Sequence, residues 1–94
     1  MSYVLIQHQV KRYSDFEAVF VGGTVRRKRM GSKGGKVFRD ARDTSNIVIL
    51  LEWENAEKAR EWAESFESRE AGKWATSGAT PTILIVEDVL DVES

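Results

Sequence analysis

The chain of 94 residues contains no cysteine, one histidine and one proline. Without cysteine it can form neither a disulfide nor a thiolate nucleophile, and a zinc site built from cysteine and histidine is excluded. We therefore expect no metal centre, and location in the reducing cytoplasm. No apolar run approaches the ~18 residues that a membrane-spanning helix needs, and the first ten residues lack the basic start of a signal peptide. The sequence predicts a protein with no membrane partner.

The length predicts a single domain over residues 1–94, in which folding buries only about 60–65% of the surface of the unfolded chain. The formal net charge of -1 argues against non-specific binding of nucleic acid. Residues 1–46 hold ten Lys or Arg against four Asp or Glu, whereas residues 47–94 hold four against eleven. The basic run at 26–29 is expected at the end of a helix, exposed to solvent, where its charges suit the negative pole of the helix dipole.

Apolar and β-branched residues predict four strands, separated by turn residues and by two helical patterns. The strands are expected over residues 3–10, 36–41, 47–53 and 82 to about 90. Residues 31–35, which include three glycines, are expected to form a flexible turn.

Two helices complete the pattern. Ser14 and Glu17 have the spacing of a capping box, so the first helix is expected to start there and to run to about Met30. Asn55 is expected to cap the second helix, and a further short helical turn is expected through Trp74. The order β-α-β-β-α-β describes a ferredoxin-like α+β sandwich, with four antiparallel strands and both helices on one face.

Two strands are apolar on both faces. Every residue is apolar over Ile47–Leu51 and over Ile83–Val86, whereas an antiparallel strand with one solvated face should alternate. Two helices can cover only one face of the sheet, and exposed apolar surface costs roughly 25 cal/mol per Å². We therefore expect a homodimer in which two sheets face each other, which gives a dimeric α+β barrel.

Three segments carry a resemblance to a known family. They are a strand that ends in Glu-Trp at 52–53, the helix start NAEKAREW at 55–62, and TPTILIVED at 80–88. With the β-α-β-β-α-β order, they make the chain similar to the antibiotic biosynthesis monooxygenase-like (ABM) family of the dimeric α+β barrel superfamily. The resemblance implies a pocket between sheet and helices and, as one activity, the cofactor-independent oxidation of aromatic compounds.

Haem-degrading members of this group also resemble the chain, because they have a tryptophan at the position of Trp62. Their haem-ligating histidine, however, matches Gly72, which has no side chain to bind iron, and their first-strand asparagine matches His8. We therefore expect neither haem nor any other cofactor.

Four residues are candidates for the site. Histidine titrates near neutral pH, so His8 is the default proton-transfer candidate, but it shares the strand parity of apolar residues, and lone histidines on such faces are more often hydrogen-bonded core residues. The resemblance implies that Trp62 lines the pocket, with Phe66 and Phe20 as further aromatic walls. The alternative for these rings is core packing, which is the role expected of Trp53.

RNA-binding RRM domains share the β-α-β-β-α-β order, but they stack bases on exposed aromatic residues of the first and third strands. The third strand, NIVILLEW, offers aliphatic residues instead, so no nucleic-acid partner is expected. Two functions remain open. The protein is either a monooxygenase-like enzyme for a small aromatic ligand, or a non-catalytic homodimer that binds a small molecule or serves a structural role.

Overall fold

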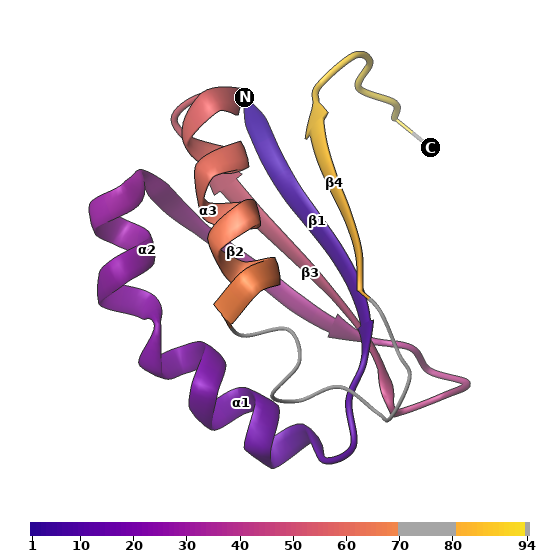
Figure 1. Ribbon diagram of the computed structural model, residues 1–94. Coiled ribbons are helices and arrows are strands. Elements are labelled where there is room, and N and C mark those ends of the chain that lie inside the picture. The colour runs from indigo at the N-terminus through magenta and orange to yellow at the C-terminus, as the bar shows by residue number, and fades with distance from the viewer. Residues whose placement is uncertain (70–80, 94) are drawn as a thin grey trace.

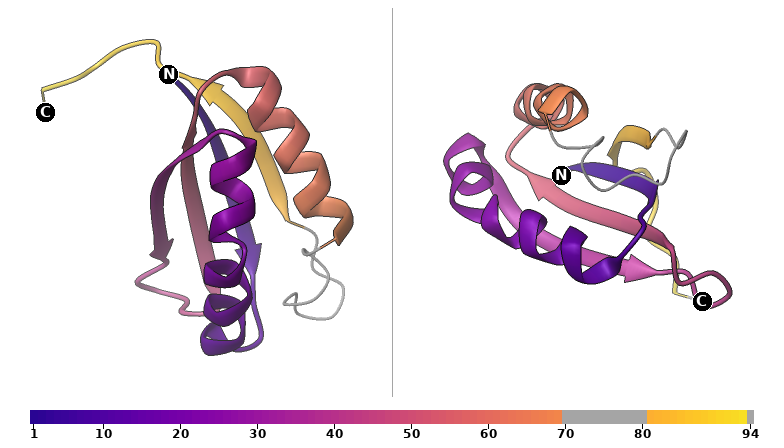
Figure 2. Two further views of the ribbon diagram at one scale, coloured as in Figure 1. Left: turned by 90° about the vertical axis from the view of Figure 1, so that its left-hand side faces the viewer. Right: turned by 60° about the horizontal axis from the view of Figure 1, so that its bottom comes forward.

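The computed structural model describes residues 1–69 and 81–93. Its elements are β1 (Ser2–Gln9), α1 (Tyr13–Gly22), α2 (Thr24–Met30), β2 (Ser32–Arg39), β3 (Asn46–Trp53), α3 (Ala56–Arg69) and β4 (Thr82–Glu87). The strands form one antiparallel sheet in the order β2-β3-β1-β4, and the helices lie on one of its faces (Figures 1 and 2). The predicted ferredoxin-like α+β fold is confirmed. Gly72 and the turn expected through Trp74 lie outside the described residues.

The helix-covered face of the sheet forms the core. Alternate residues of β1 and β3 point to this face, and the register sets Val4 opposite Leu51 and Ile6 opposite Ile49. Trp53 has the same parity and is fully buried, as predicted. In the described part of the chain, no helix is long and apolar enough to cross a bilayer. The buried apolar residues are Val4, Ile6, Val10, Phe16, Phe20, Ile47, Ile49, Leu51, Trp53, Ala59, Trp62, Ala63 and Phe66.

The helix α3 follows its sequence closely. The side chain of Asn55 accepts a hydrogen bond of 2.9 Å from the backbone N–H of Lys58, so Asn55 is the predicted cap. Residues spaced by three and four along the helix are buried: Ala59, Trp62, Ala63 and Phe66. The 3.6-residue period therefore presents one apolar stripe to the sheet.

The first helix departs from the prediction in two ways. It begins at Tyr13 after an extended Arg12, with no side-chain cap, so the expected capping box of Ser14 and Glu17 is wrong. At this end of the helix the ring of Tyr13 packs on that of Phe16 instead, with the ring centroids 5.8 Å apart. The helix is also interrupted at Gly23, which separates α1 from α2. Two successive glycines weaken a helix by about 1 kcal/mol each, and here they divide it.

The strand β2 begins at Ser32 and not at Lys36, so the flexible turn expected over residues 31–35 is wrong. Gly31 ends α2 in the left-handed conformation with φ of 111°, and an irregular register between Ser32 and Gly34 follows within the strand. A Cβ atom at Gly35 would overlap the backbone carbonyl of Leu50 in β3. Glycine is therefore needed for close strand approach. At the other end of the chain, β4 stops at Glu87, short of the predicted limit near residue 90.

Candidate functional site

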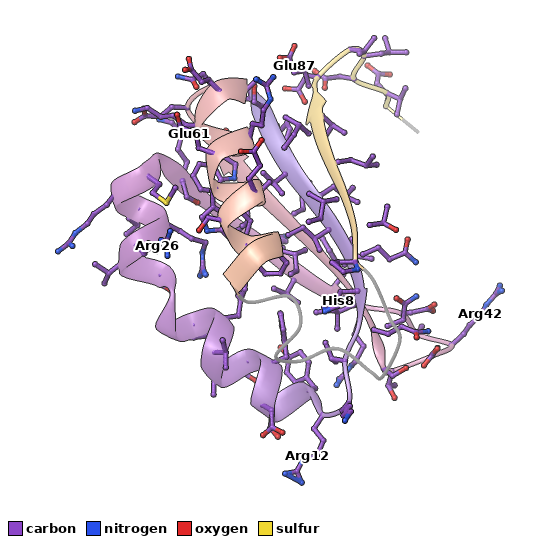
Figure 3. The ribbon with its side chains drawn as sticks, in the orientation of Figure 1. His8, Arg12, Arg26, Arg42, Glu61 and Glu87 are labelled. Atoms are coloured by element: carbon purple, nitrogen blue, oxygen red, sulfur yellow. The ribbon has the colours of Figure 1, made fainter. Side chains whose placement is uncertain are left out.

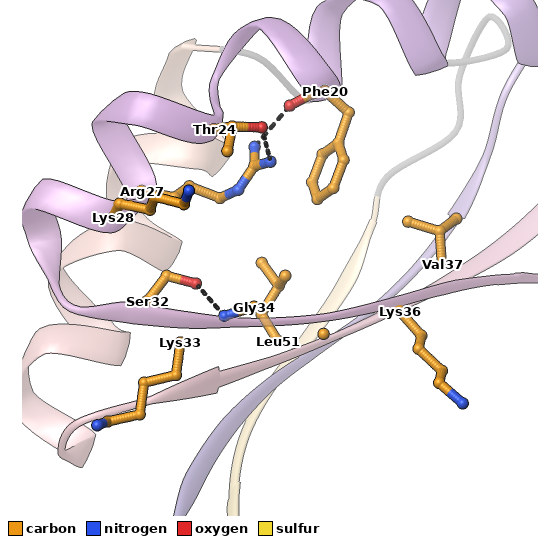
Figure 4. A pocket seen from close by; sticks show the side chains of 11 residues that line it. Phe20, Thr24, Arg27, Lys28, Ser32, Lys33, Gly34, Lys36, Val37 and Leu51 are labelled. Carbon is orange, nitrogen blue, oxygen red and sulfur yellow. Dashed lines mark hydrogen bonds between the residues drawn. The ribbon is translucent and has the colours of Figure 1, made fainter.

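A cavity of about 340 Å³ lies between α2 and β2, on the helix-covered side of the sheet (Figure 4). The end of α1 supplies an aromatic ring, α2 supplies polar and basic residues, and the glycine-containing part of β2 supplies backbone. The sheet contributes two aliphatic side chains. The lining residues are Phe20, Thr24, Arg27, Lys28, Ser32, Lys33, Gly34, Gly35, Lys36, Val37 and Leu51.

The central feature of the cavity is the contact between Phe20 and Arg27. The guanidinium carbon of Arg27 lies 3.9 Å from the centre of the Phe20 ring, in cation–π geometry. Arg27 is only 7% exposed. Its Nη1 donates a hydrogen bond of 2.7 Å to the Phe20 carbonyl, and its Nη2 donates one of 3.2 Å to Oγ1 of Thr24. The planar donor group is thus held from three sides.

The break at Gly23 explains why Arg27 can bind there. A helix leaves its last carbonyl groups without partners inside the helix. At the end of α1, the carbonyl of Phe20 accepts from Arg27, and the carbonyl of Val21 accepts a bond of 2.7 Å from the hydroxyl of Thr24. Residues of α2 therefore close the end of α1, and the bend between the two helices forms one wall of the cavity.

The charged residues that line the cavity in the described part of the chain are all basic. Arg27 and Lys28 extend from α2, whereas the side chains of Lys33 and Lys36 point to the other side of β2 (Figure 4). The basic run was expected to be solvated. That holds for Lys28 and Arg29, but it is wrong for Arg27, because its cation lies inside the domain.

Of the aromatic residues expected to form the pocket, Phe20 lines the cavity and Trp62 and Phe66 do not. These two rings pack with Trp53 in the core, with centroid distances of 5.5 Å from Trp53 to Trp62 and 5.1 Å from Trp62 to Phe66. The indole Nε1 of Trp53 is buried and has no hydrogen-bond acceptor among the described residues. The tryptophan pair thus joins α3 to β3.

His8 lies in β1, on the helix-covered face, and is 2% exposed. Figure 3 labels its position in β1, where it pairs with Ile47, whereas the residue of β3 that lines the cavity is Leu51, four positions along the strand. The structure therefore does not bring His8 into the lining of the cavity. Within residues 1–69 and 81–93, no group of three His, Asp or Glu side chains could hold a metal ion.

No family model and no curated protein sequence matches the chain. Among solved structures, a candidate antibiotic biosynthesis monooxygenase from Bordetella bronchiseptica is similar, with a TM-score of 0.73 and 21% identity over 95% of this chain and 97% of that one. The chain has the fold of that protein. A second structure, of an antibiotic biosynthesis monooxygenase, is similar with a TM-score of 0.63 and 16% identity over 96% and 100% of the two chains. The structure of a protein from Mycobacterium tuberculosis is similar with a TM-score of 0.62 and 14% identity over the full length of both chains.

The resemblance found in the sequence is thus confirmed at the level of the fold. Sequence reasoning found Phe20 and missed the other lining residues, among which Arg27 has a buried cation. Its signal was present, because Arg27 follows Phe20 by seven positions on the same helical stripe as Phe16. A charged residue on an apolar stripe, after a pair of glycines, indicates a cation turned into the domain.

Proposed function

We propose that the chain is a single-domain, cytoplasmic homodimer that oxidises a small, electron-rich aromatic compound with O₂ and without a cofactor. The observation that carries this proposal is the Arg27–Phe20 wall of a half-open cavity, in a chain with the fold of a candidate antibiotic biosynthesis monooxygenase. An aromatic ligand can pack against the Phe20 ring and the aliphatic side chains of Val37 and Leu51. The basic residues of α2 favour the deprotonated form of a phenol.

The proposed chemistry begins with loss of the phenol proton. The phenolate then transfers an electron to O₂, and the resulting radical pair combines to a ring peroxide. One oxygen atom stays on the ring as a carbonyl, and the other leaves as water with the two hydrogen atoms that the phenol loses. The product is a quinone, and O₂ is the only oxidant. The protein contributes orientation and removal of water, effects that lower a barrier by several kcal/mol when geometry is tight.

His8 is the proposed proton acceptor. It lies on the inner face of the sheet but is 2% exposed and outside the lining of the cavity, so the proposal requires the core around His8 to open when the ligand binds. We expect His8→Ala to abolish turnover, and His8→Gln to do the same, because glutamine keeps hydrogen bonding but takes up no proton near neutral pH. Full activity in His8→Gln with folding intact would remove His8 from the mechanism.

The proposed homodimer uses the sheet face that carries no helix. Alternate strand residues on this outer face are apolar and only partly buried or exposed in one chain: Leu5, Phe38, Val48, Leu50, Leu84 and Val86. A second copy laid against this face would bury apolar surface on both chains at about 25 cal/mol per Å². Light scattering is expected to give twice the chain mass, and a monomer at micromolar concentration would contradict this part of the proposal.

Oxygen uptake separates the proposed enzyme from a binding protein. We would screen polycyclic phenols and quinones by thermal shift and then follow O₂ with an electrode, using the matched compounds without a hydroxyl group as controls. Stabilisation with O₂ consumption, and ¹⁸O from ¹⁸O₂ in the product, supports the enzyme. Stabilisation without O₂ consumption supports the second function, a non-catalytic homodimer that binds a small molecule.

A further inference from the structure

The cavity between α2 and β2 has an apolar end and a basic end (Figure 4). The ring of Phe20 and the side chain of Val37 lie at one end, whereas Lys28 and Ser32 lie at the other, where α2 passes into β2. Among the described residues that line the cavity, none is acidic. A ligand that fits both ends therefore has an apolar body and a negatively charged group.

The turn at Gly31 sets the positions of Lys28 and Ser32. Gly31 ends α2 in the left-handed conformation, and its N–H donates a hydrogen bond of 3.2 Å to the carbonyl of Lys28. Its own carbonyl accepts a bond of 3.2 Å from the N–H of Glu54, which follows β3. A Cβ atom at Gly31 would lie 2.8 Å from Cδ of Lys58, so the turn packs tightly on α3. The backbone of the basic end is thus held before a ligand binds, which lowers the entropic cost of binding.

Both side chains at the basic end can donate to an anion. The hydroxyl oxygen of Ser32 accepts a bond of 3.2 Å from the N–H of Gly34, and its O–H can still donate. Lys28 is exposed and forms no ion pair with any residue that the structure describes. The carboxylate of Glu54, beside the turn, is already bound by Lys58 at 2.7 Å. An ionised group on a ligand would therefore meet an ammonium and a hydroxyl without displacing an ion pair.

We infer that the compound bound in this cavity is an ionised aromatic carboxylic acid, with its ring system at the apolar end and its carboxylate on Lys28 and Ser32. The inference names the substrate class of the proposed monooxygenase and rests on the aromatic ligand proposed above. A carboxylate suits the basic end better than a phenol because it is ionised at neutral pH and accepts from two donors at once. Arg27 is stacked on Phe20, so its charge lies beside the ring system instead.

The matched probes are 6-hydroxy-2-naphthoate and its methyl ester, which share the ring and the phenol and differ in charge. In a fluorescence titration we expect the wild-type chain to bind the acid at least about tenfold more tightly than the ester, because charge-assisted hydrogen bonds are the strong ones. This ratio should fall below about threefold in Lys28→Gln and persist in Lys28→Arg, which keeps the charge. The control is Arg29→Gln, which removes the charge of an exposed neighbour outside the lining and should keep the ratio.

Equal binding of acid and ester by the wild-type chain, or an equal loss in Lys28→Gln and Arg29→Gln, would overturn the inference. Failure of both compounds to bind at millimolar concentration would overturn it as well. Oxygen uptake tests the proposed function separately. Lys28-dependent binding of the acid without O₂ consumption would support the carboxylate site and contradict the enzyme. Equal affinities for the two compounds, with both oxidised at the same rate, would support the enzyme and overturn the carboxylate site.

Discussion

The guanidinium of Arg27 is stacked on the ring of Phe20 while the same group holds the backbone carbonyl of that residue. One cation therefore fixes both the ring orientation and the end of α1. Because the two residues stand on opposite sides of the break at Gly23, this contact also sets the angle between α1 and α2. The width of the cavity depends on it.

Replacing Arg27 by methionine removes the charge and the donors but keeps an unbranched apolar side chain. Hydrogen bonds from charged groups contribute about 1.5–3 kcal/mol each, so we expect Arg27→Met to lower the free energy of unfolding by about 2–4 kcal/mol. The matched control is Lys28→Met, an exposed neighbour for which the change should stay within about 0.5 kcal/mol. Urea unfolding measures both. An equal change in the free energy of unfolding in the two variants would show that the Arg27 contacts do not stabilise the fold.

Replacing Trp62 by alanine removes a ring that packs against both Trp53 and Phe66. We expect a loss of about 3–5 kcal/mol of unfolding free energy, typical of a large buried aromatic residue. Glu61→Ala, one position away on the exposed side of α3, serves as control. A loss below about 1 kcal/mol in Trp62→Ala would contradict the burial described above.

Replacement by alanine should change the free energy of unfolding in opposite directions at two glycines, Gly35 and Gly22. At Gly35 the added Cβ overlaps the backbone carbonyl of Leu50, and backbone cannot move aside cheaply, so Gly35→Ala should destabilise the domain by about 3 kcal/mol or more. Nothing lies within 4 Å of a Cβ at Gly22, the last residue of α1. Gly22→Ala should therefore stabilise by up to about 1 kcal/mol. Thermal unfolding of the two variants, compared with wild type, checks both signs.

The pair Glu54 and Lys58 predicts a specific pH dependence. The hydrogen bond of 2.7 Å from Lys58, together with its charge, lowers the pKa of Glu54 below the ordinary value of 4.5. The folded state thus binds the Glu54 proton less readily than the unfolded state. This contribution to stability is fully present above pH 4.5 and is lost as the pH falls through the lowered pKa.

The variant Glu54→Gln should therefore be slightly less stable than wild type at pH 6, and the difference should shrink toward pH 3. Both side chains are exposed, so the effect is small and salt weakens it. Melting temperatures at low salt across this range measure the difference. A difference that stays constant with pH would mean that the ion pair is not its source.

The parts of the fold that follow from local periodicity could be predicted from the sequence. The alternation of β1, the apolar run of β3 and the stripe of α3 each depend on residues within a few positions of one another, and Asn55 is a cap that needs only its own helix. The start of α1 could not be found in this way. Ser14 has the right chemistry for a cap, but the helix starts one residue before it, where Tyr13 packs on Phe16.

The site was less predictable because its residues depend on tertiary contacts. Gly34 and Gly35 have the composition of a turn, and only the approach of β3 to β2 makes them strand residues. Trp62 and Phe66 would lie on the apolar stripe of their helix whether they line a cavity or pack in the core. The sequence therefore could not distinguish the two roles, and the structure places both residues in the core. Phe20 was the member of the expected set that the cavity includes.

The division of the first helix at Gly23 gives the domain two parts that can change at different rates during evolution. The aromatic core of β3 and α3 stands apart from most of the cavity wall, which comes from α2 and from the bulged start of β2. Substitutions at the exposed positions of these two short segments, such as Lys28 and Lys33, can alter the shape and charge of the cavity while the sheet keeps its packing. A scaffold of this kind can acquire new ligands without first losing its fold.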